Sequence, residues 1–455
     1  MDTKKLRQKI LDLAVHGKLV PQDPNDEPAS VLLERIKAEK EGLIKEGKIK
    51  RNKKSAKTSD TPHYENVPFE VPEGWKYVPV SELFCLNPKS EITDDTSVGF
   101  IPMACVNDGF SGNHQFEKRI WKEVKKGYCH FQNGDIGIAK ISPCFENLKS
   151  TIFQNLPNNY GAGTTELVIL RPLNIHAKFY LYLFKSQWYI SEGTKYFKGV
   201  VGQQRVHKGI FTDLQIPLPP LTEQYRIVAE IEKWFALIDQ IEQGKADLQT
   251  AIKQTKSKIL DLAIHGKLVP QDPNDEPAIE LLKRIHPDFT PCDNGHYAQL
   301  PLSWSLAPMQ TLCSLVDGEK QNGMERTNLD VKYLRGEREA KTLTSGKYVA
   351  ANSLLILVDG ENSGEVFRTP IEGYQGSTFK QLSINDNMNT DYVLQLIHLH
   401  RNTLRENNVG SAIPHLNKKI FRAIEVPIPP YREQQRIVDA INIAFRHLDT
   451  IMESL

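Results

Sequence analysis

The sequence repeats one 21-residue segment almost unchanged, and this repeat limits the folds that the chain can adopt. Residues 9–29 (KILDLAVHGKLVPQDPNDEPA) recur as residues 258–278, and only Val15 and Ile264 differ between the copies. A second pair has a different spacing: IPLPPLTEQYRIV (216–228) returns as VPIPPYREQQRIV (426–438). Because internal repeats mark repeated structural units, the chain of 455 residues is predicted to contain two copies of one frame.

Each copy of this frame encloses a long insert. The sequence VPEGW (71–75) has a weaker echo in LPLSW (300–304), so each copy runs from a Pro-x-x-Trp segment to a Pro-Pro-x-x-Glu-Gln segment. The interiors, about 75–215 and 304–425, do not resemble each other. Their patterns predict mixed α/β domains. Strand-like runs occupy 135–139, 166–170 and 353–358, and helical stretches lie near 175–190 and 390–405.

One long helix is predicted after the first Pro-Pro pair, from Thr222 to Ala263. Proline excludes helix before it, Thr222 is a candidate N-cap, and Gly266 is a candidate stop. Apolar residues recur at the 3.5-residue spacing of a coiled-coil seam, and 42 residues would span about 63 Å. The predicted packing positions are Ile227, Ile231, Trp234, Ile238, Ile241, Leu248, Ile252, Ile259 and Leu262.

The two ends of the chain repeat the two halves of this helix. Residues 432–455 match 222–245, and residues 2–14 match 251–263. The matching packing positions are Leu6, Ile10, Leu13, Ile437, Ile441 and Leu448. We therefore predict a mixed α/β fold in which two globular α/β domains are separated by a long antiparallel coiled-coil helix pair, with cyclic pseudo-twofold symmetry.

The inserts carry hydrogen-bonding side chains suited to reading DNA. In the first insert, Gln203, Gln204 and Arg205 match the donors and acceptors of adenine or guanine edges, and Lys198 and Lys208 match phosphates. Other candidates there are Lys140, Ser142, Asn147, Lys149, Thr164 and Thr165. Candidates in the second insert are Gln375, Ser377, Thr378, Lys380, Ser411, His415, Asn417 and Lys418. An ordinary solvated loop is the alternative for each residue taken alone.

Enzymatic and metal-binding patterns are weak. The sequence has no Gly-rich phosphate loop, no Gly-x-Ser-x-Gly and no His-Glu-x-x-His. Asp330, Glu339 and Lys341 have the outline of a nuclease cluster, which leaves a single-chain metal-dependent nuclease as one alternative and a scaffold without base readout as another. The six cysteines form no CxxC pair, which favours free thiols in the cytoplasm and no metal site.

Hydropathy and charge limit which membrane and nucleic-acid interactions the chain is expected to make. No apolar run approaches the length of a membrane helix. A net charge of +1 excludes a uniformly basic nucleic-acid coat but permits local DNA-binding patches. Lysines concentrate between residues 37 and 57, only in the first copy, and predict a solvated helix that becomes a linker, with a phosphate-contacting arm as the alternative.

Together, the doubled frame and its Lys-Ile-Leu-Asp-Leu-Ala-x-His-Gly-Lys-Leu-Val-Pro-Gln run resemble the specificity subunit of type I restriction-modification systems. This resemblance implies a non-catalytic chain whose inserts are target recognition domains, each reading half of a bipartite, asymmetric site in double-stranded DNA. It implies that the paired helices fix the spacing and dock two modification subunits. Those subunits would carry S-adenosylmethionine, and restriction subunits would use ATP and Mg, so no cofactor is expected in this chain.

The resemblance and the repeats predict the following domain boundaries. They are a conserved helical region at 1–40, a lysine-rich linker at 41–70, the first target recognition domain at 71–218, a central region with the spacer helix at 219–290, the second target recognition domain at 291–428, and a C-terminal helix at 429–455.

Overall fold

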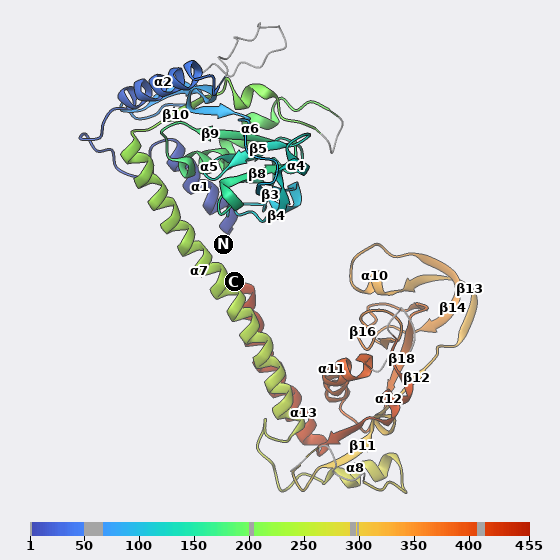
Figure 1. The fold of residues 1–455 in the computed structure, drawn as a ribbon. Coiled ribbons are helices and arrows are strands. Elements are labelled where there is room, and N and C mark those ends of the chain that lie inside the picture. Colours follow the sequence, from blue (N-terminus) through green and yellow to red (C-terminus); the bar gives the residue numbers. More distant parts are fainter. Residues whose placement is uncertain (1, 50–66, 200–203, 292–296, 298–299, 407–414) are drawn as a thin grey trace. The chain divides into compact units, whose positions relative to one another are not determined.

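The computed structural model of the protein describes residues 2–49, 67–199, 204–291, 297, 300–406 and 415–455. The chain divides into two compact units, Met1–Gly244 (unit 1) and Lys245–Leu455 (unit 2). Helix α7 (Leu221–Ile264) begins in unit 1 and ends in unit 2 as one unbroken helix (Figure 1). The boundary between the units falls inside the predicted central region.

Unit 1 contains a mixed set of helices and strands, as its sequence predicts. The helices are α1 (Thr3–Val15), α2 (Ala29–Lys45), α3 (Val80–Leu83), α4 (Trp121–Val124), α5 (Ala177–Lys185) and α6 (Gln187–Thr194), with 3-10 turns η1 (Met103–Cys105), η2 (Pro157–Asn159) and η3 (Lys208–Phe211). The strands are β1 (Lys76–Pro79), β2 (Phe84–Leu86), β3 (Ser97–Ile101), β4 (Glu117–Ile120), β5 (Cys129–Gln132), β6 (Ile136–Ala139), β7 (Ser150–Ile152), β8 (Tyr160–Gly163), β9 (Leu167–Pro172) and β10 (Gln215–Leu218).

Unit 2 has a similar succession of elements. Its helices after α7 are α8 (Ala278–Ile285), α9 (Met309–Leu312), α10 (Val331–Leu334), α11 (Thr390–Glu406), α12 (Lys418–Ala423) and α13 (Tyr431–Ser454). Its strands are β11 (Ser305–Pro308), β12 (Cys313–Val316), β13 (Lys320–Leu329), β14 (Thr342–Val349), β15 (Leu354–Leu357), β16 (Val366–Arg368), β17 (Gly373–Gln375), β18 (Phe379–Ile384) and β19 (Glu425–Ile428).

The two inserts share one strand order despite their dissimilar sequences. One sheet of unit 1 has the order β2-β9-β6-β7, and its counterpart in unit 2 has the order β12-β18-β15-β16. The second layer differs: unit 1 has the sheet β4-β3-β8-β5, whereas β13, β14 and β17 of unit 2 close into a small barrel. The central strands β6 and β15 are short, fully buried runs, which is why they lack the alternation of a half-exposed strand.

A short strand pair closes each insert at its base. In unit 1, β1 follows Trp75 and pairs antiparallel with β10, so that Lys76 faces Leu218. In unit 2, β11 follows Trp304 and pairs with β19, so that Ser305 faces Ile428. The first and last residues of each insert therefore lie side by side. The dissimilar interior of each insert is enclosed between the two strands of an equivalent antiparallel pair.

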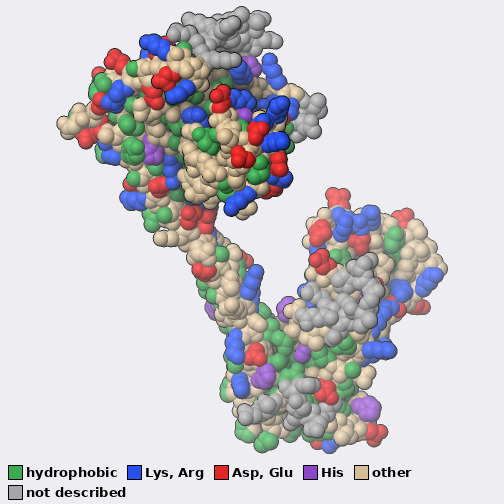
Figure 2. Space-filling view, viewed as in Figure 1, with side chains coloured by type: hydrophobic (Ala, Val, Ile, Leu, Met, Phe, Trp, Pro, Cys, Tyr) green, Lys and Arg blue, Asp and Glu red, His purple; other side chains and the backbone are tan. Residues whose placement is uncertain are grey.

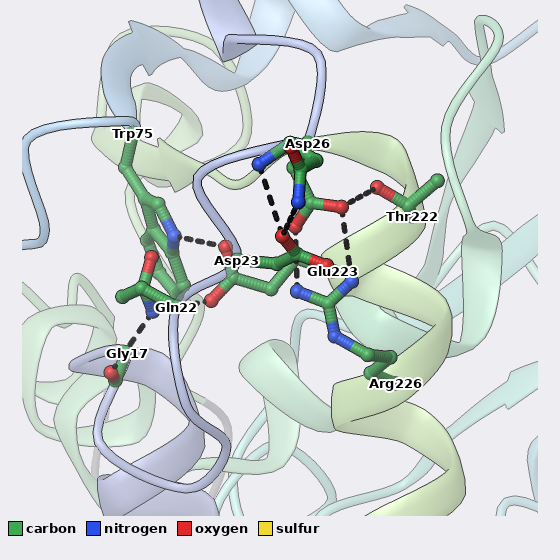
Figure 3. A network of polar contacts seen from close by, with 9 residues as sticks. Gly17, Gln22, Asp23, Asp26, Trp75, Thr222, Glu223 and Arg226 are labelled. Atoms are coloured by element: carbon green, nitrogen blue, oxygen red, sulfur yellow. Dashed lines mark hydrogen bonds and ion pairs between the residues drawn. The ribbon is translucent and has the colours of Figure 1, made fainter.

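The repeated residues around the buried Glu223 form one polar network (Figure 3). Glu223 accepts a hydrogen bond from Trp75 Nε1 at 2.8 Å and another from Gln22 Nε2 at 2.6 Å. Burial raises the pKa of the Glu223 carboxyl. Asp26 accepts from Arg226 Nη2 at 2.5 Å, and this bond lowers the pKa of Asp26. The network joins the Gln-Asp-Pro-Asn-Asp loop, the start of the insert and the start of α7.

Unit 2 contains the same network. Glu433 accepts from Trp304 Nε1 at 3.0 Å and from Gln271 Nε2 at 2.6 Å, and Arg436 pairs with Asp275 at 2.6 Å. The glycine before each loop has a matching role at positive φ, because a side chain on Gly266 would approach Pro301 Cγ to 2.4 Å. The repeated motifs are therefore structural parts that fix each insert to its helix.

Helices α1 and α7 pack antiparallel in unit 1. Arg7 Nη2 lies 2.6 Å from Asp239 Oδ1 and 3.1 Å from Glu242 Oε2, and its guanidinium lies over the Phe235 ring. Ile10 and Ile238 belong to the same buried core. The contacts of α1, which has 13 residues, therefore lie on the part of α7 that belongs to unit 1.

Helix α13 makes the equivalent contacts with α7 in unit 2. Lys256 Nζ lies 2.5 Å from Asp449 Oδ1 and lies over the ring of Phe445. Shifted by the two repeat spacings, Arg7, Asp239 and Phe235 correspond to Lys256, Asp449 and Phe445, respectively. The contacts confirm the mixed α/β fold with a long antiparallel helix pair, and the same contacts recur in each unit.

Some details of the predicted seam are wrong. Trp234, Ile241 and Leu248 have exposed fractions of 42%, 42% and 39%, and Phe235 is buried in place of Trp234. The buried positions of this part of α7 are Ile227, Ile231, Phe235 and Ile238. The remaining predicted positions are buried or half-buried: Leu6, Ile10, Leu13, Ile252, Ile259, Leu262, Ile437, Ile441 and Leu448.

Two further predictions are affected by the helix ends. Helix α7 begins at Leu221, so Thr222 lies inside the first turn and is not the N-cap; its hydroxyl instead donates to Asp26 at 2.5 Å. Helix α2 continues to Lys45, beyond the predicted start of the linker at residue 41. Within this helix, Lys40 donates to the Ser81 carbonyl at 2.7 Å. Much of the lysine-rich segment, residues 50–57, lies outside the described residues.

Candidate nucleic-acid interface

Three loops of unit 1 meet beyond the end of β6, and we call them the unit 1 loop cluster. They are residues 140–142, residues 164–166, and Lys198 together with residues 204–206. Lys140 N donates to Glu166 O at 2.9 Å, and Val206 N donates to Lys140 O at 2.9 Å. Lys198 and Arg205 exchange backbone hydrogen bonds. The cluster therefore has a fixed backbone that brings together candidates from three separate parts of the sequence.

Unit 2 has a loop cluster at the same place in its sheet. It consists of residues 358–359 after β15, residues 376–378 between β17 and β18, and residues 415–416. Val358 N donates to Thr378 O at 2.9 Å, and Leu416 N donates to Val358 O at 2.8 Å. The backbones of Asp359 and His415 form an isolated antiparallel β-bridge. By these pairings, His415 occupies the position of Arg205.

Arg205 is held by a carboxylate of its own cluster. Its Nε and Nη2 donate to the two carboxylate oxygens of Glu166 at 3.1 and 2.7 Å, and these hydrogen bonds lower the pKa of Glu166. The Arg205 side chain is 53% exposed. In unit 2, His415 Nδ1 lies 2.7 Å from Asp359 Oδ1. Each cluster thus presents one exposed side chain with N–H donors, Arg205 or His415, that is paired with a carboxylate of the same cluster.

The other predicted site residues of unit 1 fall into separate groups. Lys140, Ser142, Thr164, Thr165, Lys198 and Gln204 belong to the unit 1 loop cluster, and Lys208 begins η3 shortly after it. Lys149 instead donates to the Met103 carbonyl at 3.3 Å and lies near Asp108. Asn147 lines a different cavity of about 410 Å³, with Lys4 and Arg7. Gln203 lies outside the described residues.

In unit 2 the predicted residues are also divided. Ser377, Thr378 and His415 belong to the loop cluster. Gln375 donates to the Phe379 carbonyl at 2.6 Å, and Lys380 pairs with Asp317, so both are engaged within the sheet. Asn417 caps α12 by accepting from Lys419 N and Ile420 N. Lys418 is exposed, and Ser411 lies outside the described residues.

Glu166 and Asp359 are members of the clusters that the sequence pattern missed. Both directly follow features that were noted, since Glu166 follows Thr165 and Asp359 follows the run at 353–358. The proposed nuclease residue Asp330 has a structural role: it accepts from Tyr333 N at 3.1 Å and caps α10. Within the described residues, no group of three or more His, Cys, Asp and Glu side chains is placed to hold a metal ion.

Charges of both signs are mixed on the surface. Figure 2 shows Lys and Arg interspersed with Asp and Glu over the visible face. Exposed apolar side chains gather on the long helices. On α7 these are Tyr225, Trp234, Leu237, Ile241 and Leu248, and on α13 they are Tyr431, Ile443 and Ile451. None of the described helices is both long enough and apolar enough to cross a membrane.

Comparison with protein families gives a match over most of the chain. The family described as "Type I restriction modification DNA specificity domain" matches residues 72–250 and 318–454. The type I restriction enzyme EcoAI specificity subunit of Escherichia coli is 38% identical over 419 residues, which cover 79% of this chain and 70% of that protein. The EcoEI specificity subunit, also of E. coli, is 45% identical over 326 residues, which cover 62% of this chain and about half, 54%, of that protein.

Solved structures show the same fold at lower identity. A chain from a structural study of complex assembly and conformational transition of the type I R-M system matches with a TM-score of 0.63 and 17% identity, covering 85% of this chain and 94% of that one. The HsdS subunit from Thermoanaerobacter tengcongensis matches with a TM-score of 0.53 and 17% identity, covering 85% and 93%.

Proposed function

The chain belongs to the type I restriction-modification DNA specificity family, and we propose that it reads a bipartite, asymmetric site in double-stranded DNA for a multisubunit methyltransferase and endonuclease. One observation carries this proposal: two inserts with the same strand order present different side chains from equivalent loop clusters. Two different half-sites require two domains with different base-contacting side chains, and a shared fold can present both sets. The predicted domains at 71–218 and 291–428 would be the two readers.

The partners that we propose follow from the surface of the helices and from the family. Exposed aromatic and aliphatic side chains on α7 and α13, including Trp234 and Ile443, support docking of two modification subunits there. Those subunits would supply S-adenosylmethionine and adenine methylation, and restriction subunits would supply ATP- and Mg-dependent cleavage. The chain itself would be a non-catalytic cytoplasmic protein that holds no cofactor.

We further propose that α7 fixes the number of unread base pairs between the half-sites. Its 44 residues form one helix, which at 1.5 Å per residue is about 66 Å long. One turn of B-DNA is roughly 34 Å, so the helix is long enough to relate two major-groove contacts. Because the net charge of the chain is only +1, we propose that the partner subunits supply many of the contacts with DNA phosphates.

Genome-wide mapping of methylated adenines tests the proposed function. A host that produces the modification subunits should methylate one bipartite sequence when it also produces this chain, and should lose that methylation when the gene is deleted. Complementation with the intact chain is the control. Methylation that persists at the same sequence without the chain would contradict the proposal, as would endonuclease activity of the chain alone that depended on Asp330.

A further inference from the structure

Arg205 and His415 occupy equivalent positions in two inserts whose sequences do not resemble each other. Each forms an isolated antiparallel β-bridge with the second residue after the central strand: Arg205 pairs with Ile141, two residues after β6, and His415 pairs with Asp359, two residues after β15. Each also has a carboxylate partner, but the carboxylates come from different loops, Glu166 from the β8–β9 turn and Asp359 from the segment after β15. The same arrangement built from unrelated residues points to a shared task.

The bonds to Glu166 leave a defined part of Arg205 available. They use Nε and one hydrogen of Nη2, which form one edge of the guanidinium. Among the described residues no acceptor is recorded for Nη1, so the outer end, formed by Nη1 and Nη2, retains a pair of donors. A guanidinium donates through such a pair to O6 and N7 of guanine in the major groove.

Glu166 is itself fixed, so it can orient the guanidinium. Its backbone N–H donates to Thr164 Oγ1 at 3.2 Å, and its carbonyl accepts from Lys140 N at 2.9 Å. The carboxylate also places a negative charge beside the Arg205 cation, which weakens attraction to phosphates of any sequence. An arginine held in this way favours a base edge over the sequence-independent backbone.

The histidine in unit 2 has a comparable geometry. A carboxylate only accepts hydrogen bonds, so the contact with Asp359 at 2.7 Å places the proton on His415 Nδ1. Nε2, on the other side of the ring, remains available to a base, and the side chain is 48% exposed. Asp359 therefore sets both the orientation and the tautomer of the imidazole.

We propose that Arg205 and His415 are the specificity-determining residues of the two loop clusters, that Arg205 reads a guanine, and that Glu166 and Asp359 are positioning residues that hold them. This inference rests on the proposed function and adds the residues that discriminate between bases. It distinguishes Arg205 from Lys140 and Lys198 of the same cluster, because among the described residues neither lysine forms an ion pair with a carboxylate as Arg205 does with Glu166.

The test uses the full chain in complex with its modification subunits and duplexes that carry single base-pair changes across the methylated site. Arg205→Lys keeps the charge but loses the paired donors, so discrimination at one G·C pair should fall about tenfold. Glu166→Gln should relax the same pair, and His415→Ala should relax a pair in the other half-site only. Competition binding at fixed salt measures each effect.

Matched controls come from a second exposed pair in unit 1. Arg119 donates to Glu117 at 2.7 Å within β4, so Arg119→Lys and Glu117→Gln should leave discrimination unchanged. If Arg205→Lys or Glu166→Gln leaves the preferred bases unaltered, or if Arg205→Ala weakens binding equally for all sequences, the assignment is wrong. A wild-type complex that binds every duplex equally would instead overturn the proposed function.

Discussion

Glu223→Gln will lower the free energy of unfolding of unit 1 by about 1 kcal/mol, since one intramolecular hydrogen bond contributes about 0.5–1.5 kcal/mol. Glu223 is fully buried, and both of its oxygens accept hydrogen bonds, from Trp75 and Gln22. A glutamine offers one acceptor oxygen and turns an NH₂ group toward the other donor. The variant therefore loses one hydrogen bond while preserving the shape of the side chain.

Hydrogen exchange measured by mass spectrometry can assign this loss to a unit. Glu223→Gln should speed exchange in unit 1, and the equivalent change Glu433→Gln should speed exchange in unit 2, because Glu433 accepts from Trp304 and Gln271. Glu230→Gln, on the same helix at a carboxylate that pairs with the exposed Lys233, is the control. Equal exchange in the Glu223→Gln variant and the wild type would show that the network does not hold the insert in place.

Lys185→Met will remove a large pH dependence of stability. Lys185 is fully buried, its ammonium donates to the carbonyls of Gly109 and Leu148, and burial lowers its pKa to about 7. The unfolded chain, with a lysine pKa near 10.5, binds a proton that the folded chain lacks between about pH 7 and 10.5. Stability of the wild type should therefore rise across this window, by up to about 5 kcal/mol.

Urea unfolding at a series of pH values measures this effect. Below about pH 7 both states are protonated at Lys185, so its contribution becomes constant. The methionine variant should lose the rise between pH 7 and 10, whereas Lys178→Met, on the exposed face of the same helix, should keep it. An identical pH profile for Lys185→Met and the wild type would contradict the assigned environment of Lys185.

Local signals made the main helix predictable. Pro219 and Pro220 exclude a helix before them and Gly266 adopts positive φ, so the predicted range differs from the observed one by a single residue at each end. The face of the helix was less predictable. A 3.5-residue seam selects Trp234, but the buried side chain is Phe235, whose ring lies under the Arg7 guanidinium of α1.

Long-range contacts were beyond the sequence pattern. Trp75, Gln22 and Glu223 each stand in a recognisable repeat, but nothing in the repeats states that these residues meet across separations of 148 and 201 residues. The loop clusters were predicted in part because donors such as Arg205 mark nucleic-acid contacts. Glu166 was missed because a carboxylate repels phosphate, and its role depends on an arginine 39 residues away.

An internal duplication tests most directly whether each insert reads its own half-site. Residues 76–218 would be replaced by residues 305–428, since both segments begin and end in the same antiparallel strand pair. Single-molecule sequencing should then find methylation at an inverted repeat of the half-site that unit 2 reads. Methylation of the original asymmetric sequence by the folded hybrid would contradict the account.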